Sequence, residues 1–151
     1  MELANHTFLI TGGASGLGEA CARRFVAGGA NVVIADVNSA QGEALAGVLG
    51  NRAVFVQTDV TSAEQVESAI GAARQQWDTL QGVVNCAGIL AAARIVGRDK
   101  PHDLSLFQRV IEVNLVGAFN VLRLSATAMT QNEPVTDDGE RGVIINTATV
   151  A

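Results

Sequence analysis

Residues 7–18 of the chain read TFLITGGASGLG, a short apolar run that ends in a glycine-rich turn. The run Thr7–Thr11 is too short for a helix and is rich in β-branched and aromatic side chains, which indicates a buried strand. Helical spacing follows at once over Gly16–Ala27. A strand that turns through glycines directly into a helix is typical of the start of a βαβ unit.

The same alternation of strand and helix continues along the chain. Four further apolar runs predict strands, and three stretches between them have helical spacing. The strands are Asn31–Asp36, Arg52–Gln57, Gly82–Asn85 and Gly142–Asn146; the helices are Ser39–Leu49, Ser62–Trp77 and about Leu104–Met129. Nearly continuous hydrophobicity is typical of strands that are buried on both faces of a parallel sheet. The 151 residues therefore predict a single α/β domain with a doubly wound parallel sheet, a Rossmann fold.

Capping and loop signals place the remaining segments. Overlapping capping boxes, Thr61 to Glu64 and Ser62 to Gln65, mark the start of the third helix. Two charged segments, 91–103 and 130–141, interrupt the rhythm and indicate exposed loops. The second contains the pair Asp137–Asp138, which we interpret as a solvated turn rather than a metal site.

Composition narrows the possible partners. A net charge of −5 and a pI of about 4.9 argue against nucleic acid or an anionic membrane as the main partner. Two cysteines, Cys21 and Cys86, are too few for a disulfide framework or a zinc cluster, so we expect no metal. The sequence shows no apolar run near the ~20 residues of a membrane helix and no signal peptide. We expect a soluble, cytoplasmic protein.

The glycine turn suggests a site for an anion. Glycines allow a positive φ and let the backbone approach a phosphate closely. The helix that follows directs its free N–H groups and its positive dipole end at the same point. No Gly-Lys-Ser/Thr closes the turn, which excludes a Walker loop. A purely structural turn is the alternative, and the strand before and the helix after it disfavour that interpretation.

Asp36 ends the second strand, 18 positions beyond Gly18. A carboxylate there can accept hydrogen bonds from both adenosine ribose hydroxyls, each contributing on the order of 1.5–3 kcal/mol. It would repel a 2′-phosphate, and no Arg or Lys lies in the turn or directly after Asp36. These features favour NAD over NADP. A helix N-cap aspartate is the structural alternative, and a reductase that prefers NADP is the functional one.

With these residues the chain resembles the short-chain dehydrogenase/reductase family, whose pattern Thr-Gly-x-x-x-Gly-x-Gly occupies residues 11–18. Further motifs of that family follow in order: Asp59-Val60, Asn85-Cys86-Ala87-Gly88 and Val113-Asn114-Leu115. Within the family, residues 131–134 and 141–148 resemble the subgroup of type 2 3-hydroxyacyl-CoA dehydrogenases. The resemblance implies a sheet in the order 3-2-1-4-5 that continues into further strands, and NAD-dependent homotetramers that oxidise 3-hydroxyacyl-CoA, a small-molecule substrate.

The resemblance also assigns roles to residues. The cofactor contacts that it implies come from Gly12, Ser15, Gly16, Leu17, Gly18, Asp36, Val37, Asp59, Val60, Cys86, Ala87 and Gly88. Asp59 and Val60 would hold the adenine ring, and Cys86 would present its backbone rather than act as a nucleophile. Asn114 matches the family's active-site asparagine, and Thr149 occupies the place of the family's serine. Asparagine is a poor mid-helix residue, so Asn114 by itself indicates a bend, a bound water or a surface position.

The family chemistry needs a Tyr-x-x-x-Lys pair, in which the ammonium lowers the pKa of the phenol. The chain contains no tyrosine, and its only lysine, Lys100, lies in a predicted loop. We therefore expect the pair to lie beyond Ala151 in a longer protein, and expect these residues alone to show no turnover. A naturally short module that binds NAD or another subunit without catalysis is the alternative.

Overall fold

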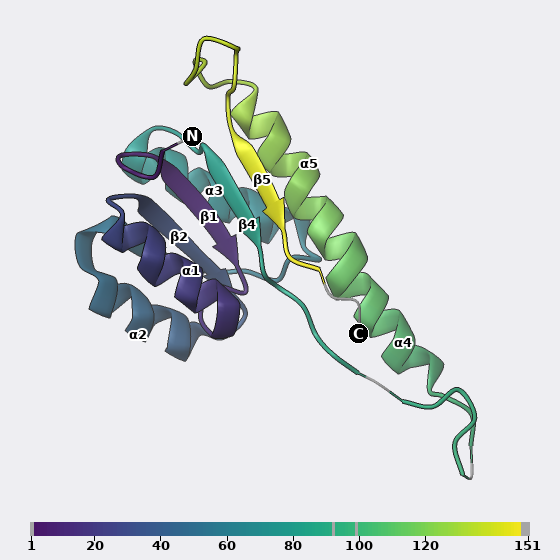
Figure 1. Cartoon of the computed structure of the whole chain (residues 1–151). Coiled ribbons are helices and arrows are strands. Elements are labelled where there is room, and N and C mark those ends of the chain that lie inside the picture. Colours follow the sequence, from purple (N-terminus) through teal and green to yellow (C-terminus); the bar gives the residue numbers. More distant parts are fainter. Residues whose placement is uncertain (1, 92, 99, 149–151) are drawn as a thin grey trace.

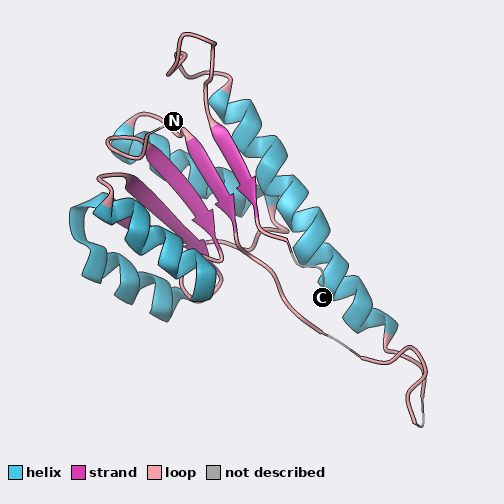
Figure 2. Cartoon of the chain, in the orientation of Figure 1, coloured by secondary structure: helices cyan, strands magenta, loops and turns pink. Residues whose placement is uncertain are grey.

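The computed structural model of the chain describes residues 2–91, 93–98 and 100–148. Five parallel strands form one sheet in the order β3-β2-β1-β4-β5 (Figures 1 and 2). The strands are β1 (Thr7–Thr11), β2 (Asn31–Asp36), β3 (Ala53–Gln57), β4 (Gly82–Asn85) and β5 (Val143–Asn146). The predicted doubly wound fold and the strand order implied by the resemblance are confirmed.

Helices cover both faces of this sheet (Figure 1). They are α1 (Gly16–Ala27), α2 (Ser39–Leu49), α3 (Ala63–Trp77), α4 (Leu104–Ile111) and α5 (Ala118–Met129), with a short 3-10 turn at Gly50–Arg52 and a π-helical segment at Glu112–Gly117. Side chains alternate between the faces of a strand, so each strand contributes to two clusters. Leu9 packs with α3 and α5 on one face, and its neighbour Ile10 packs with α1 and α2 on the other.

Three element boundaries differ from the predicted ones. Arg52 belongs to the 3-10 turn, where its guanidinium donates to the carbonyl of Gly29, and β3 begins one residue later. Likewise β5 begins at Val143 rather than at Gly142. Helix α3 begins after Ser62, which is its N-cap and accepts a hydrogen bond from the Gln65 N–H.

Only one half of one predicted capping box forms. In a complete box the Gln65 side chain would accept the N–H of Ser62. Instead its Oε1 accepts the N–H of Asp59, at 2.8 Å. The Thr61 hydroxyl donates to Asp59 Oδ1 and caps no helix, so the box from Thr61 to Glu64 was a wrong prediction.

The long helix predicted over 104–129 is continuous but changes its winding at the π-helical segment. Among the described residues, Leu104–Met129 is the one helical stretch whose length and composition would suit a membrane span. Composition of this kind is also typical of a helix that packs on a sheet. Val113, Val121 and Met129 are buried in the core, so this stretch is a helix of the α/β fold.

Candidate functional site

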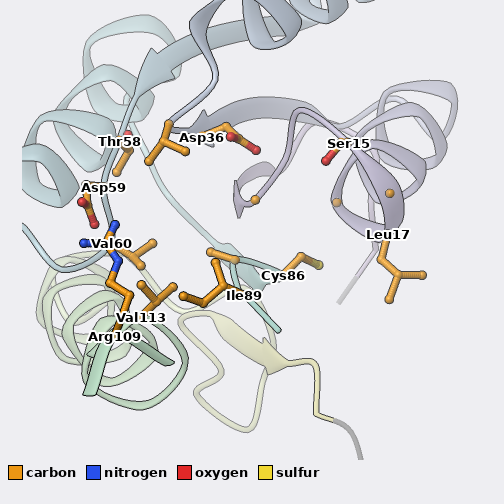
Figure 3. A pocket seen from close by; sticks show the side chains of 16 residues that line it. Ser15, Leu17, Asp36, Thr58, Asp59, Val60, Cys86, Ile89, Arg109 and Val113 are labelled. Atoms are coloured by element: carbon orange, nitrogen blue, oxygen red, sulfur yellow. The ribbon is translucent and has the colours of Figure 1, made fainter. Parts of the chain in front are cut away.

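A cleft of about 410 Å³ lies at the carboxyl ends of the strands. It opens at β1, which pairs with β2 on one side and with β4 on the other, so that the order of the strands reverses there. Open α/β sheets bind ligands at this point. All twelve residues implied as cofactor contacts line the cleft, and Thr58, Ile89, Arg109 and Val113 complete its lining (Figure 3).

The glycine turn forms a cradle in which Gly12 and Gly18 have no room for a side chain. Gly12 and Gly16 have φ angles of 61° and 53°, in the left-handed region. A Cβ at Gly12 would lie 2.7 Å from the N–H nitrogen of Ala87, and one at Gly18 would overlap the carbonyl oxygen of Gly12. Helix α1 begins at Gly16, and no side chain caps its N-terminus. Free N–H groups at the start of a helix bind phosphate well, so this cradle fits a pyrophosphate.

Asp36 lies at the rim of the cleft, at the end of β2 (Figure 3). Its Oδ2 accepts the N–H of Ala14 and its Oδ1 accepts the N–H of Asn38, both at 3.0 Å. The N-cap of α2 is Asn38, whose side chain accepts from Gln41, so the N-cap interpretation of Asp36 is wrong. A carboxylate has about four acceptor positions. The two backbone bonds therefore fix the group and leave capacity for sugar hydroxyls.

Asp59 and Val60 follow β3 and form the opposite end of the cleft from Ser15 and Leu17 (Figure 3). Asp59 Oδ1 accepts from the Thr61 N–H at 3.0 Å and from its hydroxyl at 2.8 Å. These hydrogen bonds hold the pKa of the Asp59 carboxyl below its usual value, with a smaller contribution from the charge of Arg109. The side chain is therefore an ionised acceptor at neutral pH.

A buried asparagine that the sequence did not single out holds Val60 in place. Asn120 of α5 donates from Nδ2 to the carbonyl of Val60, at 2.8 Å, and is only 6% exposed. Gly117, one turn earlier, packs against the Val60 side chain with no space for a Cβ. An asparagine within an apolar helical stripe is the signal that points to such a contact, because a buried amide needs a partner.

The fourth strand ends in a polar network below the cleft. Asn85 accepts from the Thr11 hydroxyl at 3.3 Å and donates to Asn146 Oδ1 at 2.8 Å, which joins β1, β4 and β5. Cys86 follows, and burial, then the charge of Cys21, raise the pKa of its thiol. A thiol that stays protonated is a weak nucleophile. Cys86 lies in the cleft lining, and its role as a backbone contact rather than a nucleophile stays a prediction.

Asn114 does not line the cleft but supports one of its walls. It lies in the π-helical segment, and its side chain accepts the Ile89 N–H at 2.8 Å and donates to the Ile89 carbonyl at 2.9 Å. Ile89 follows Gly88 in the chain, and both residues line the cleft. Of the open interpretations of this residue, the surface position matches the structure, because Asn114 is exposed; it also lies where the helix changes its winding. Thr149 lies outside the described residues.

Metal ligands do not gather in the part of the chain that the structure describes. Over residues 2–91, 93–98 and 100–148, no group of three or more His, Cys, Asp or Glu side chains is placed to hold an ion. Asp138 of the predicted acidic turn bonds instead to Thr136 and to the N–H of Glu140.

The sequence matches a known family over most of its length. The family profile described as short chain dehydrogenase matches residues 6–151. The 3-hydroxyacyl-CoA dehydrogenase type-2 of Drosophila melanogaster is 48% identical over 151 residues, which cover 99% of this chain and 59% of that protein. The human protein of the same name is 50% identical over 145 residues, or 95% of this chain and 55% of that protein.

Solved structures agree with these relatives. The 3-hydroxyacyl-CoA dehydrogenase type-2 of Mycobacterium avium superposes with a TM-score of 0.90 at 45% identity, over 96% of this chain and 56% of that one. The 3-ketoacyl-(acyl-carrier-protein) reductase of Brucella melitensis, solved in complex with NADH, gives 0.86 at 32% identity over 98% and 59%. The chain thus spans little more than half the length of the proteins that it matches.

Proposed function

The chain belongs to the short-chain dehydrogenase family, and from that membership we propose that it is the NAD-binding part of an oxidoreductase. The observation that carries this proposal is the cleft, in which the glycine cradle and Asp36 meet where the strand order reverses. A relative solved with NADH supports the choice of a nicotinamide cofactor. When bound, NAD would supply the acceptor for a hydride.

Each part of the cleft has one task in this proposal. The glycine turn and the start of α1 hold the pyrophosphate, because free N–H groups there complement its charge. Asp36 accepts from the ribose hydroxyls and repels a 2′-phosphate. Asp59 and Val60 hold the adenine ring, while Cys86, Ala87 and Gly88 form the floor along which the dinucleotide extends.

The substrate in this proposal is a secondary alcohol, with a 3-hydroxyacyl-CoA as the specific candidate. Its support is the name shared by the relatives from fly, human and Mycobacterium avium. Asn114 would take part in a proton relay through water or lysine, and Thr149 would polarise the substrate oxygen. The printed sequence has no tyrosine. We therefore assign proton abstraction to residues outside the printed sequence. We expect the 151 residues by themselves to bind NAD without turnover.

We further propose that the full-length protein is a homo-oligomer, as the family resemblance implies. An apolar stripe along α4 and its continuation supports this proposal. Its members are Leu104, Phe107, Ile111, Leu115 and Phe119, which are 66, 54, 37, 62 and 61% exposed. Contiguous apolar surface of this kind is typical of protein contacts.

Calorimetric titration of the chain with NAD and with NADP tests the proposal. We expect saturable NAD binding that is tighter than NADP binding. Gly18→Ala should weaken NAD at least tenfold, on the order of 1.4 kcal/mol, because its methyl group would overlap the Gly12 carbonyl. Gly47→Ala is the matched control, since its methyl group meets open space on α2.

Tighter binding of NADP would overturn the role of Asp36, and binding of neither dinucleotide would overturn the proposal. Oxidation of 3-hydroxybutyryl-CoA by the 151 residues would contradict the expected absence of turnover. NAD binding by a longer form of the protein that oxidises other secondary alcohols but no 3-hydroxyacyl-CoA would overturn the specific substrate and keep the reaction class.

A further inference from the structure

Arg109 is the one cationic side chain among the described residues that line the cleft. It extends from α4 one helical turn before Val113, and its guanidinium lies beside the carboxylate of Asp59 (Figure 3). Its charge acts on Asp59. No sequence motif assigned a role to Arg109. In the folded chain it lines the same end of the cleft as Asp59 and Val60.

The polar groups at this end of the cleft have unused capacity. Within the described residues, both hydrogen bonds to the Asp59 side chain go to Oδ1, and Oδ2 has no partner there. No hydrogen bond within that part of the chain uses the guanidinium of Arg109, which carries five N–H donors. An ionised acceptor and a set of donors therefore line the same end of the cleft as Val60.

This arrangement complements adenine. The adenine ring presents an amino donor next to a ring nitrogen that accepts, whereas a 6-oxo purine presents an acceptor in place of the amino group. The carboxylate of Asp59 can receive only a donor. Planar guanidinium groups donate to ring nitrogens and stack on bases, which an ammonium does less well.

We propose that Arg109 is a base-recognition residue, which donates a hydrogen bond to a ring nitrogen flanking the adenine amino group while Asp59 accepts from that group. This inference rests on the proposed NAD-binding function and deepens it, since it assigns adenine specificity to a residue on a different element from the glycine turn. The two charged side chains then read opposite halves of one edge of the base.

The test measures affinities by calorimetry for wild type, Arg109→Gln, Arg109→Lys and Arg24→Gln. Arg24 is an exposed residue of α1 outside the cleft and is the charge-matched control. The ligands are NAD, ADP, 1-deaza-ADP and 7-deaza-ADP. The deaza analogues each lack one of the ring nitrogens next to the amino group, so they identify the acceptor atom. Circular dichroism melts verify that every variant is folded.

We expect Arg109→Gln to weaken NAD and ADP about tenfold, as one lost charge-assisted hydrogen bond does at an exposed site. Arg109→Lys should lose part of that affinity, and Arg24→Gln none. One deaza analogue should bind wild type about tenfold more weakly than ADP does. That analogue alone should be insensitive to Arg109→Gln.

Two results would overturn the inference while leaving the proposed function intact. In one, wild type binds NAD and Arg109→Gln binds it equally well. In the other, Arg109→Gln weakens ADP and both deaza analogues by the same factor, which identifies a diffuse effect of charge rather than a bond to the base. Failure of wild type to bind NAD would overturn the proposed function, and this inference with it.

Discussion

At the scale of single residues, the charge of Asp36 decides which dinucleotide fits. Asp36→Asn keeps the size of the side chain but replaces one carboxylate oxygen by an NH₂ group, which donates hydrogen bonds. The amide therefore cannot accept the N–H groups of both Ala14 and Asn38 as the carboxylate does. We expect NAD affinity to fall about tenfold, since bonds from the ribose to a charged acceptor weaken. The ratio of NADP to NAD affinity should rise, because the repulsion of a 2′-phosphate is removed. Calorimetry with both dinucleotides measures this ratio.

Asp137→Asn is the matched control for Asp36→Asn, because Asp137 is an exposed residue of the acidic loop, remote from the cleft lining. It makes the same change in net charge and should leave both affinities unchanged. A ratio of the two affinities that stays constant in Asp36→Asn would show that the carboxylate does not select the cofactor.

Residues within a short motif could be placed from the sequence, and residues from distant segments could not. The glycines of the turn and Asp36 lie on one βα unit and the strand after it, so their spacing already places them together. Arg109 lines the cleft, and Asn120 bonds to the carbonyl of Val60, only because the long helix packs against β4 and β5 in the folded chain, which spacing along the chain does not show. The bonds from Ala14 and Asn38 to Asp36 also depend on the folded backbone.

At the scale of elements, the π-helical segment at Glu112–Gly117 links the long helix to the loop after β4. Such segments are often found at functional sites. Helical periodicity predicted the helix but not its change in winding, because the buried residues Val113, Gly117 and Val121 keep a spacing of four residues across the segment. The unfavourable position of Asn114 within a helix was the local signal, and its two bonds to Ile89 explain it.

Asn114→Ala should release this link. Loss of two hydrogen bonds, on the order of 1 kcal/mol each, should lower the free energy of unfolding by about 1–3 kcal/mol in urea titrations. The Ile89 amide should exchange its hydrogen faster, because the acceptor at 2.8 Å is gone. Asn51→Ala, at an exposed position of the 3-10 turn, is the control. If the hydrogen of the Ile89 amide exchanges at the wild-type rate although the variant is less stable, Asn114 does not hold Ile89 in place.

At the scale of the whole molecule, the order β3-β2-β1-β4-β5 explains why motifs from four strands meet. Parallel strands joined by right-handed crossovers have their carboxyl ends at one edge of the sheet. The motifs after β1, β2, β3 and β4 therefore line one cleft. Strand–helix alternation predicted the sheet, whereas the order came from the resemblance, since alternation alone is compatible with more than one order of winding.

The uncovered surfaces of the molecule predict self-association. Within the part of the chain that the structure describes, β5 pairs with β4 alone, and the apolar stripe of α4 and its continuation lies at the surface. Covering one large apolar side chain contributes about 1.5–3 kcal/mol, so several of them can sustain a contact between copies. We expect sedimentation velocity to show dimers or larger species at micromolar concentration.

The double variant Leu115→Glu/Phe119→Glu should be monomeric, because each carboxylate would be desolvated in the contact. Val48→Glu, at an apolar residue of α2 that is 71% exposed, should associate like wild type. A wild-type chain that sediments as a monomer, or a Val48→Glu variant that dissociates as fully as the double variant, would show that the α4 stripe is not the contact surface.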